Sequence, residues 1–262
     1  MNGSPPSILP VQDPPPRPSK MKPPHPHLPN IEGHGGGSLL LLISPVRTGK
    51  STLISNVLLR DDFYDAQERF DQVNIISNTI ANDVTSRFLR EAFKGNCHDF
   101  YSDGIINGIV ESQKKYKKED QPEIAIVLDD CLGSIKQNSM INHLASRYRH
   151  FNIKLLVISS QKFTGAVSPI IRANATDIIV GSPFPNQKEL ERIAEEYGDL
   201  FGGSKNWLKL YKRCTPNKYD FCYMDCQENT PIMYSNFEKV VARGITEEGV
   251  TADTSESEEE EL

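Results

Sequence analysis

Long apolar segments are missing from this sequence. The run Leu39–Ile43 is five residues long, whereas a helix that crosses a bilayer needs about 20 apolar residues. The first residues also lack the apolar core of a secretion signal. We therefore expect a protein that is not secreted and has no transmembrane segment.

Cysteine is scarce as well, and its placement argues against two kinds of site. The chain has five cysteines, an odd number scattered through apolar segments, which indicates reduced thiols in an intracellular compartment rather than a disulfide framework. Cys214, Cys222 and Cys226 have no well-spaced fourth ligand, so the sequence does not predict a zinc site.

The excess of negative charge is confined to one end of the chain. Residues 253–262 carry six acidic side chains and no basic one, and the formal net charge is −6. The remaining part is nearly neutral, which does not by itself indicate nucleic-acid binding, although an oligomer can concentrate basic residues in a ring. The run Lys114–Lys118 is typical of a solvated helix end, with contact to DNA phosphates as the alternative.

Composition divides the chain into three parts. Residues 1–30 hold eleven of the 18 prolines, so the glycine-hinged segment 1–37 is expected to be a disordered arm. Residues 241–262 are expected to be a disordered acidic tail. Between them, 38–240 should form one α/β domain.

Within this domain, apolar runs alternate with stretches of helical spacing. We expect strands at 38–43, 72–77, 124–128, 153–159 and 176–181, and helices at 50–60, 83–94, 104–118, 137–148, 166–173 and 186–197. Segments 219–226 and 231–235 resemble a terminal hairpin. Apolar strands separated by helices predict a mainly parallel sheet with helices on both faces.

The segment after the first expected strand has the form of a phosphate-binding loop. It comprises Ser44, Pro45, Val46, Arg47, Thr48, Gly49, Lys50, Ser51 and Thr52. A strand before it and a helix after it create an anion-binding nest of backbone amides. We expect Lys50 to reach the β- and γ-phosphates of ATP and the Ser51 hydroxyl to bind Mg²⁺. Ser44 stands where the usual pattern has its first glycine, and we interpret it as a tolerated variant.

An acid pair, Asp129-Asp130, ends the apolar run 124–128. Ligands of open α/β sheets bind at the carboxyl ends of the strands. We therefore expect Asp129 to serve the Mg²⁺ site beside Ser51 and Asp130 to orient or deprotonate the attacking water. A cap or turn role for these acids is the alternative.

One expected strand, 72–77, intervenes in the sequence between the loop strand and the acid-pair strand. This arrangement is similar to the additional-strand, catalytic-acid division of P-loop ATPases, in which a polar residue after the next strand senses the γ-phosphate. Gln161 follows that strand here, and its amide is able to donate to phosphate or water.

Arginines near this strand are candidates for a finger that reaches a neighbouring subunit's site. Arg149 in "SRYRH" is the first candidate, Arg147 the second and Arg172 the third. An arginine finger stabilises charge in the transition state of phosphoryl transfer. A solvated basic helix end is the alternative interpretation for each of them.

Together these segments resemble the FtsK–HerA superfamily of DNA-translocating P-loop ATPases. The segments are LLLLISPVRTGKST, IAIVLDD, SRYRHFNIKLLVISSQ and IIRANATDIIVG, and within the superfamily they are most similar to the poxvirus-type genome-packaging ATPases of nucleocytoplasmic large DNA viruses. The resemblance covers about 38–235 and departs from the superfamily at Ser44 and at Asp130, where glutamate is usual.

The resemblance implies an ATP- and Mg²⁺-dependent motor that moves double-stranded viral DNA into a capsid. It implies a ring, a hexamer or pentamer, that holds DNA independently of sequence, with capsid or inner-membrane proteins bound through the tails. It places the protein in the virion and in virus factories of the host cytoplasm. A P-loop nucleotide or small-molecule kinase, and a nucleotide-gated scaffold without turnover, are the alternatives that the residues leave open.

Overall fold

The protein is described here by a computed structural model. It describes residues 25–32, 36–81, 86–131, 133, 135–136, 138–227 and 229–245.

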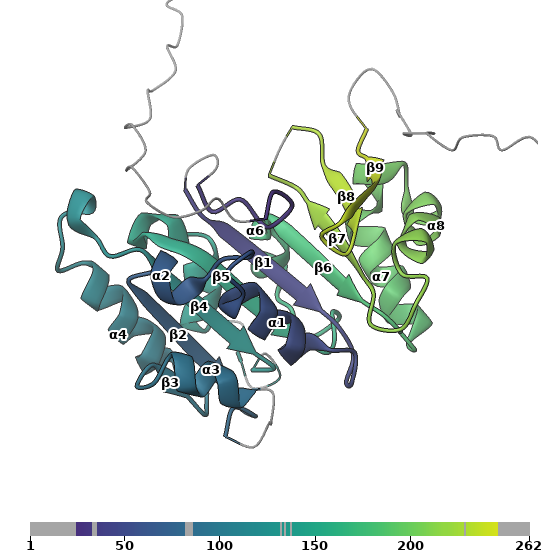
Figure 1. The fold of residues 1–262 in the computed structure, drawn as a ribbon. Coiled ribbons are helices and arrows are strands. Elements are labelled where there is room, and N and C mark those ends of the chain that lie inside the picture. Colours follow the sequence, from purple (N-terminus) through teal and green to yellow (C-terminus); the bar gives the residue numbers. More distant parts are fainter. Residues whose placement is uncertain are drawn as a thin grey trace, which may run out of the picture.

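One nine-stranded sheet runs through the described part of the chain (Figure 1). Its order is β3-β2-β4-β5-β1-β6-β7-β8-β9. The strands from β3 to β6 are parallel, and β7, β8 and β9 continue the sheet in antiparallel fashion. The mainly parallel sheet and the C-terminal hairpin predicted from the sequence are thus confirmed. The strands are β1 (Ser38–Ile43), β2 (Gln72–Ser77), β3 (Cys97–His98), β4 (Ile124–Asp129), β5 (Ile153–Ser160), β6 (Asp177–Gly181), β7 (Phe221–Asp225), β8 (Ile232–Ser235) and β9 (Lys239–Arg243).

Helices cover both faces of this sheet (Figure 1). They are α1 (Lys50–Leu59), α2 (Ala66–Arg69), α3 (Ser86–Ala92), α4 (Asp103–Gln113), α5 (Met140–Ala145), α6 (Pro169–Asn174), α7 (Gln187–Tyr197) and α8 (Ser204–Cys214), with short 3-10 turns η1 (Lys118–Asp120), η3 (Tyr148–Phe151) and η4 (Gly198–Phe201). Residues of a strand point alternately to its two faces. Leu40 and Leu42 of β1 therefore pack with α1, α2 and α3, whereas Leu39 and Leu41 pack with α4 to α8.

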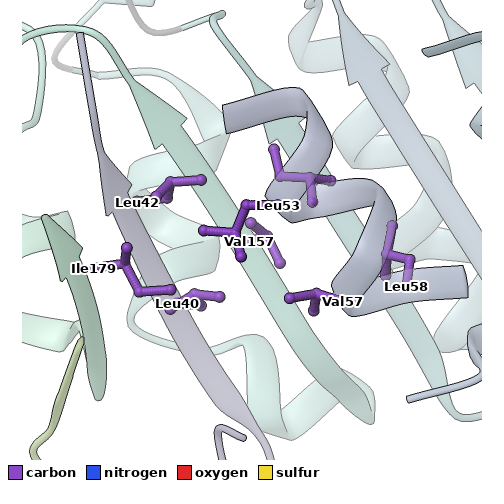
Figure 2. A pocket seen from close by; sticks show the side chains of 8 residues that line it. Leu40, Leu42, Leu53, Val57, Leu58, Val157 and Ile179 are labelled. Carbon is purple, nitrogen blue, oxygen red and sulfur yellow. The ribbon is translucent and has the colours of Figure 1, made fainter. Parts of the chain in front are cut away.

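The helix that follows the loop, α1, is seated closely on β1 and β5 (Figure 2). Leu53 and Val57 of α1 approach Leu42 and Val157 across an entirely apolar gap of about 10 Å³. Such a gap is barely the size of one water and offers it no hydrogen-bond partner. The contact therefore fixes the first turn of α1, and with it the loop, relative to the sheet.

The expected segments match the observed elements in position, with differences at the ends. The expected helix 104–118 ends as α4 at Gln113, because the four lysines in the run Lys114–Lys118 repel one another in consecutive turns. Among the helices and strands, four were not expected at all: α2, α8, β9 and the two-residue edge strand β3. The expected helices at 83–94 and 137–148 begin in residues that lie partly outside the described ones.

The described residues 25–32, within the expected arm, lie against the folded domain. Leu28 and Ile31 are buried in the part of the hydrophobic core that also includes residues of α1 and α2. Nδ1 of His27 lies 2.7 Å from the carbonyl oxygen of Phe237, and the Tyr64 hydroxyl donates to the carbonyl of Pro29. This segment therefore connects the turn after α1 with the C-terminal hairpin.

Candidate nucleotide-binding site

The loop between β1 and α1 has the backbone of an anion-binding nest. Arg47 and Gly49 both adopt positive φ, 62° and 87°, and Gly49 caps the N-terminus of α1. Thr48 Oγ1 donates to the carbonyl of Pro45 at 2.6 Å and also contacts the Ser44 hydroxyl. Alternating backbone handedness turns successive amides toward one concave side, where an anion is stabilised by the helix N-terminus.

Lys50 folds back along the same loop. Its Nζ donates to the carbonyl of Ser44 at 2.9 Å. Burial lowers the pKa of this ammonium, and the nearby carboxylates of Asp130 and Asp129 act in the opposite direction. The predicted lysine and the predicted acid pair therefore meet at one edge of the sheet.

Asp129 lies at the centre of a row of polar side chains across three neighbouring strands. Its register partners are Ser77 at the end of β2 and Ser159 in β5. The hydroxyl of Ser159 donates to Oδ1 of Asp129 at 2.5 Å, and the hydroxyl of Ser77 lies 3.5 Å from Oδ2. Burial raises the pKa of Asp129, while the bond from Ser159 and the charge of Lys50 lower it.

Asp130 and Gln161 are in direct contact. Gln161 follows β5, and its Nε2 donates to Oδ2 of Asp130. Asp130 adopts a positive φ of 55°, a conformation that aspartate tolerates better than most residues. Nδ2 of Asn78 donates to the carbonyl oxygen of Asp130 at 3.3 Å. The side chain after β4 is thereby turned away from the strand and toward the residue that follows β5.

The oxygens that the sequence assigns to Mg²⁺ fit that ion. Ser51 follows Lys50 in the first turn of α1, and Asp129 is the last residue of β4. These are hard oxygen donors, which Mg²⁺ prefers, and Mg²⁺ commonly takes one or two of them together with phosphate and water oxygens. A divalent cation would also offset the cost of burying the Asp129 charge, which is visible as its raised pKa.

The three candidate arginines precede the amino ends of β5 and β6, at the opposite ends of the strands from the 44–52 loop. Arg149 Nε donates to the carbonyl of Gly37, just before β1, at 3.3 Å. Arg147 is exposed in the preceding turn, and Arg172 pairs with Glu196 at 2.8 Å. The eight residues of β5 separate Arg149 from Gln161 by about 26 Å, so Arg149 does not reach the site of its own chain.

Sequence reasoning missed Ser77, Ser159 and Cys131 in this site. The Cys131 thiol lies 3.3 Å from the carbonyl oxygens of Ile76 and Asp129, and burial raises its pKa to about 12. It therefore serves as a protonated donor that supports the ends of β2 and β4. Both serines end or nearly end apolar strands, and that position was the available signal.

The spatial order of the strands defines the class of fold. β5, the strand that precedes Gln161, lies between the loop strand β1 and the acid-pair strand β4. This is the P-loop NTPase fold of the additional-strand type, with the 44–52 loop, the acid pair and Gln161 at the carboxyl ends of the parallel strands.

Comparison with known proteins supports this assignment of the fold. No family model matches the chain. The uncharacterised protein 075L of Invertebrate iridescent virus 6 is 26% identical over 195 residues, which cover 72% of this chain and 71% of that protein. Within the described part of the chain, none of the helices has the length and hydropathy required to cross a membrane.

Two solved structures of viral ATPases share the architecture. B204, the DNA-packaging ATPase of Sulfolobus Turreted Icosahedral Virus, superposes with a TM-score of 0.54 at 16% identity, covering 76% of this chain and 97% of that one. The genome-packaging NTPase B204 of Sulfolobus turreted icosahedral virus 2, in complex with ATP-gammaS, gives 0.51 at 16% identity, covering 77% and 98%. The resemblance drawn from the motifs is thus confirmed at the level of the fold.

Proposed function

We propose that this chain is a Mg²⁺-dependent ATPase that moves double-stranded viral DNA into a capsid. The observation that carries the proposal is the convergence of Lys50, Asp129, Asp130 and Gln161 at the sheet edge beside the loop. Its support outside this chain is the shared fold with viral genome-packaging ATPases.

The residues of the site suit hydrolysis of a bound triphosphate. The amides of 44–52 and the Lys50 ammonium would hold the phosphates and balance their charge. Ser51 and Asp129 would hold Mg²⁺, which neutralises charge on the β- and γ-phosphates. Asp130 would orient the attacking water and accept its proton, and Gln161, already bound to Asp130, would hold both in line with the γ-phosphate.

A finger from another subunit would complete the site. Arg149 is exposed at the opposite edge of the sheet, so it is able to serve a neighbour's nucleotide only in an assembly. We infer a homo-oligomeric ring, a hexamer or pentamer, in which Arg149 points to the neighbouring loop, with Arg147 and Arg172 as second choices. The ring would hold DNA through its phosphates, independently of sequence and with strong dependence on salt.

The tails would supply contacts outside the motor. We propose that segments of the 1–37 arm and the 241–262 tail bind capsid or inner-membrane proteins, in the virion and in virus factories. Deleting 1–24 and 246–262 would then abolish encapsidation and leave ATP hydrolysis intact. Intact encapsidation by this double truncation would refute a docking role for these segments.

Steady-state hydrolysis of ATP, with and without long double-stranded DNA, tests the proposal. We expect turnover that DNA stimulates and that Lys50→Ala abolishes. Tight binding of ATP without turnover on DNA would favour a nucleotide-gated scaffold. Phosphorylation of an added acceptor would favour a kinase. Either result would refute the proposal that the protein is a DNA-translocating motor.

A further inference from the structure

Tyr219 lies beside Gly49 of the 44–52 loop. A methyl group placed on Gly49 would lie 3.7 Å from Cδ1 of Tyr219. The two residues are 170 positions apart and meet because β6, which β7 follows in space, pairs with β1. The tyrosine therefore lies on the side of the loop away from β4 and its acid pair.

The Tyr219 ring is exposed, although it is large and apolar. The exposed fraction of the whole residue is 56%. Lys218 Nζ lies 4.6 Å from the ring centroid, over one face. A second planar group is therefore able to stack only on the remaining face.

The backbone of Tyr219 is in a conformation that disfavours tyrosine. Its φ is 76°, a region that bulky side chains rarely adopt and that glycine or asparagine adopts at lower cost. Residues held in this way cluster at ligand-binding sites. The backbone conformation at position 219 thus favours glycine or asparagine. The presence of a tyrosine there is therefore not explained by local folding.

The surrounding turn holds the backbone of Tyr219 in place. Ser182 accepts from the amide of Tyr219 at 3.2 Å. Asp220 accepts from the amide of Asn217 at 2.8 Å and from Asn236 Nδ2 at 3.3 Å. A side chain whose backbone is already ordered loses less freedom when a ligand binds to it.

We propose that Tyr219 is the base-binding platform of the site and stacks on the nucleobase of the bound nucleoside triphosphate. The inference rests on the proposed function, since the phosphates are taken to lie in the 44–52 loop. A base attached to phosphates in that nest and directed past Gly49 would meet the exposed side chain of Tyr219. Stacking of this kind tolerates any base, so it selects for a nucleotide over bare phosphate rather than for adenine alone.

Two probes separate the base from the phosphates: ATP, and inorganic tripolyphosphate, which has no base. Binding of each is measured by calorimetry with Mg²⁺ present, for the wild type and for Tyr219→Phe and Tyr219→Asn. Tyr116→Asn is the matched control, since Tyr116 is also exposed and lies beyond α4 on the other face of the sheet.

We expect the wild type to bind ATP more tightly than tripolyphosphate. Tyr219→Asn should weaken ATP binding roughly tenfold, within the range for loss of one stacked base, and leave tripolyphosphate binding within about twofold. Tyr219→Phe and Tyr116→Asn should resemble the wild type. The Tm of Tyr219→Asn should not fall, because asparagine relieves the positive φ.

If Tyr219→Asn weakens the binding of ATP and of tripolyphosphate equally, or does not weaken ATP binding, the role of Tyr219 as a base-binding platform is refuted. The ATPase proposal would still stand. A wild type that binds neither probe would instead overturn the proposed function, and the inference with it. If Tyr219→Asn fails to fold, Tyr219→Trp serves instead: ATP, and not tripolyphosphate, should quench the new indole fluorescence. Absence of that quenching would also refute the platform.

Discussion

The hydroxyl of Ser44 occupies the space that a side chain at position 181 would need. A β-carbon built on Gly181 at the end of β6 would lie 2.0 Å from Oγ of Ser44 and 2.8 Å from its β-carbon. The glycine missing from the start of the loop is thus matched by a glycine on the adjacent strand. Ser44 keeps its hydroxyl in contact with Thr48 inside this space.

Gly181→Ala should therefore damage the loop, and Ser44→Gly should restore it. The single variant places a methyl group within overlap distance of Ser44, and we expect a loss of about 1–3 kcal/mol in the free energy of unfolding, as for other overpacked sites, together with weaker ATP binding. The double variant should recover most of both. Denaturant unfolding of all four proteins measures the coupling, and strictly additive effects would refute the steric pairing.

Asp130→Asn should separate binding from hydrolysis. The amide keeps the shape of the carboxylate beside Gln161 but does not accept the proton of water, so kcat should fall roughly 10²–10⁴-fold. ATP affinity should stay near the wild-type value. Single-turnover hydrolysis and equilibrium binding, measured on one preparation, check this. Full turnover by the variant would remove Asp130 from the proposed chemistry.

Mixing of subunits tests the arginine finger. Arg149→Ala and Lys50→Ala should each be nearly inactive as assemblies, since a missing finger costs about 10³–10⁵-fold. A mixture of the two should regain part of the turnover, because some interfaces join an intact Lys50 to an intact Arg149.

Arg192→Ala is the control for this experiment, since Arg192 is a surface residue of α7 paired with Glu195. It should keep full activity. Wild-type turnover by assembled Arg149→Ala would refute the finger, and Arg147→Ala and Arg172→Ala would then be examined in the same way.

Asp177 should make the stability of the fold depend on pH. It is buried, accepts bonds from Ser38, Thr176, Tyr223 and Gln227, and burial raises its pKa from 3.8 to about 6. Between these values the folded state holds a proton that the unfolded state has lost. The contribution of this group to stability therefore falls as pH rises from about 4 to 6, by about 3 kcal/mol.

Denaturant unfolding across this pH range, for the wild type and for Asp177→Asn, measures the effect. The variant should be less stable, since an amide does not accept all four bonds, but it should lack this fall with pH. Glu195→Gln, a change at an exposed acid, should keep the wild-type profile. An unchanged pH profile in Asp177→Asn would show that another group titrates.

Apolar runs were sufficient to predict the five longer parallel strands, β1, β2, β4, β5 and β6, because a strand buried on both faces has few other sequences available to it. The parallel edge strand β3 has only two residues and carries no such run. The order of strands in space was not predictable in this way: β5 lies between β4 and β1 through contacts between distant segments. The missed helix α8 does carry a local signal, since Trp207, Leu210, Tyr211 and Cys214 recur at helical spacing and are buried.

The site shows the same division between local and distant information. The loop and the acid pair are contiguous motifs, and the sequence predicted that they meet. The pairing of Asp129 with Ser77 and Ser159 depends on strand register. The approach of Tyr219 to Gly49 depends on the antiparallel addition of β7 to β6. Neither is visible from local spacing.

Displacement of a third strand from a DNA triplex tests the central claim most directly. A motor that moves along double-stranded DNA strips a short triplex-forming oligonucleotide from its path, and the release is followed by fluorescence. The account predicts release that requires ATP hydrolysis, is independent of the flanking sequence, and is absent in Lys50→Ala and Asp130→Asn. DNA-stimulated hydrolysis without any release of the third strand would contradict it.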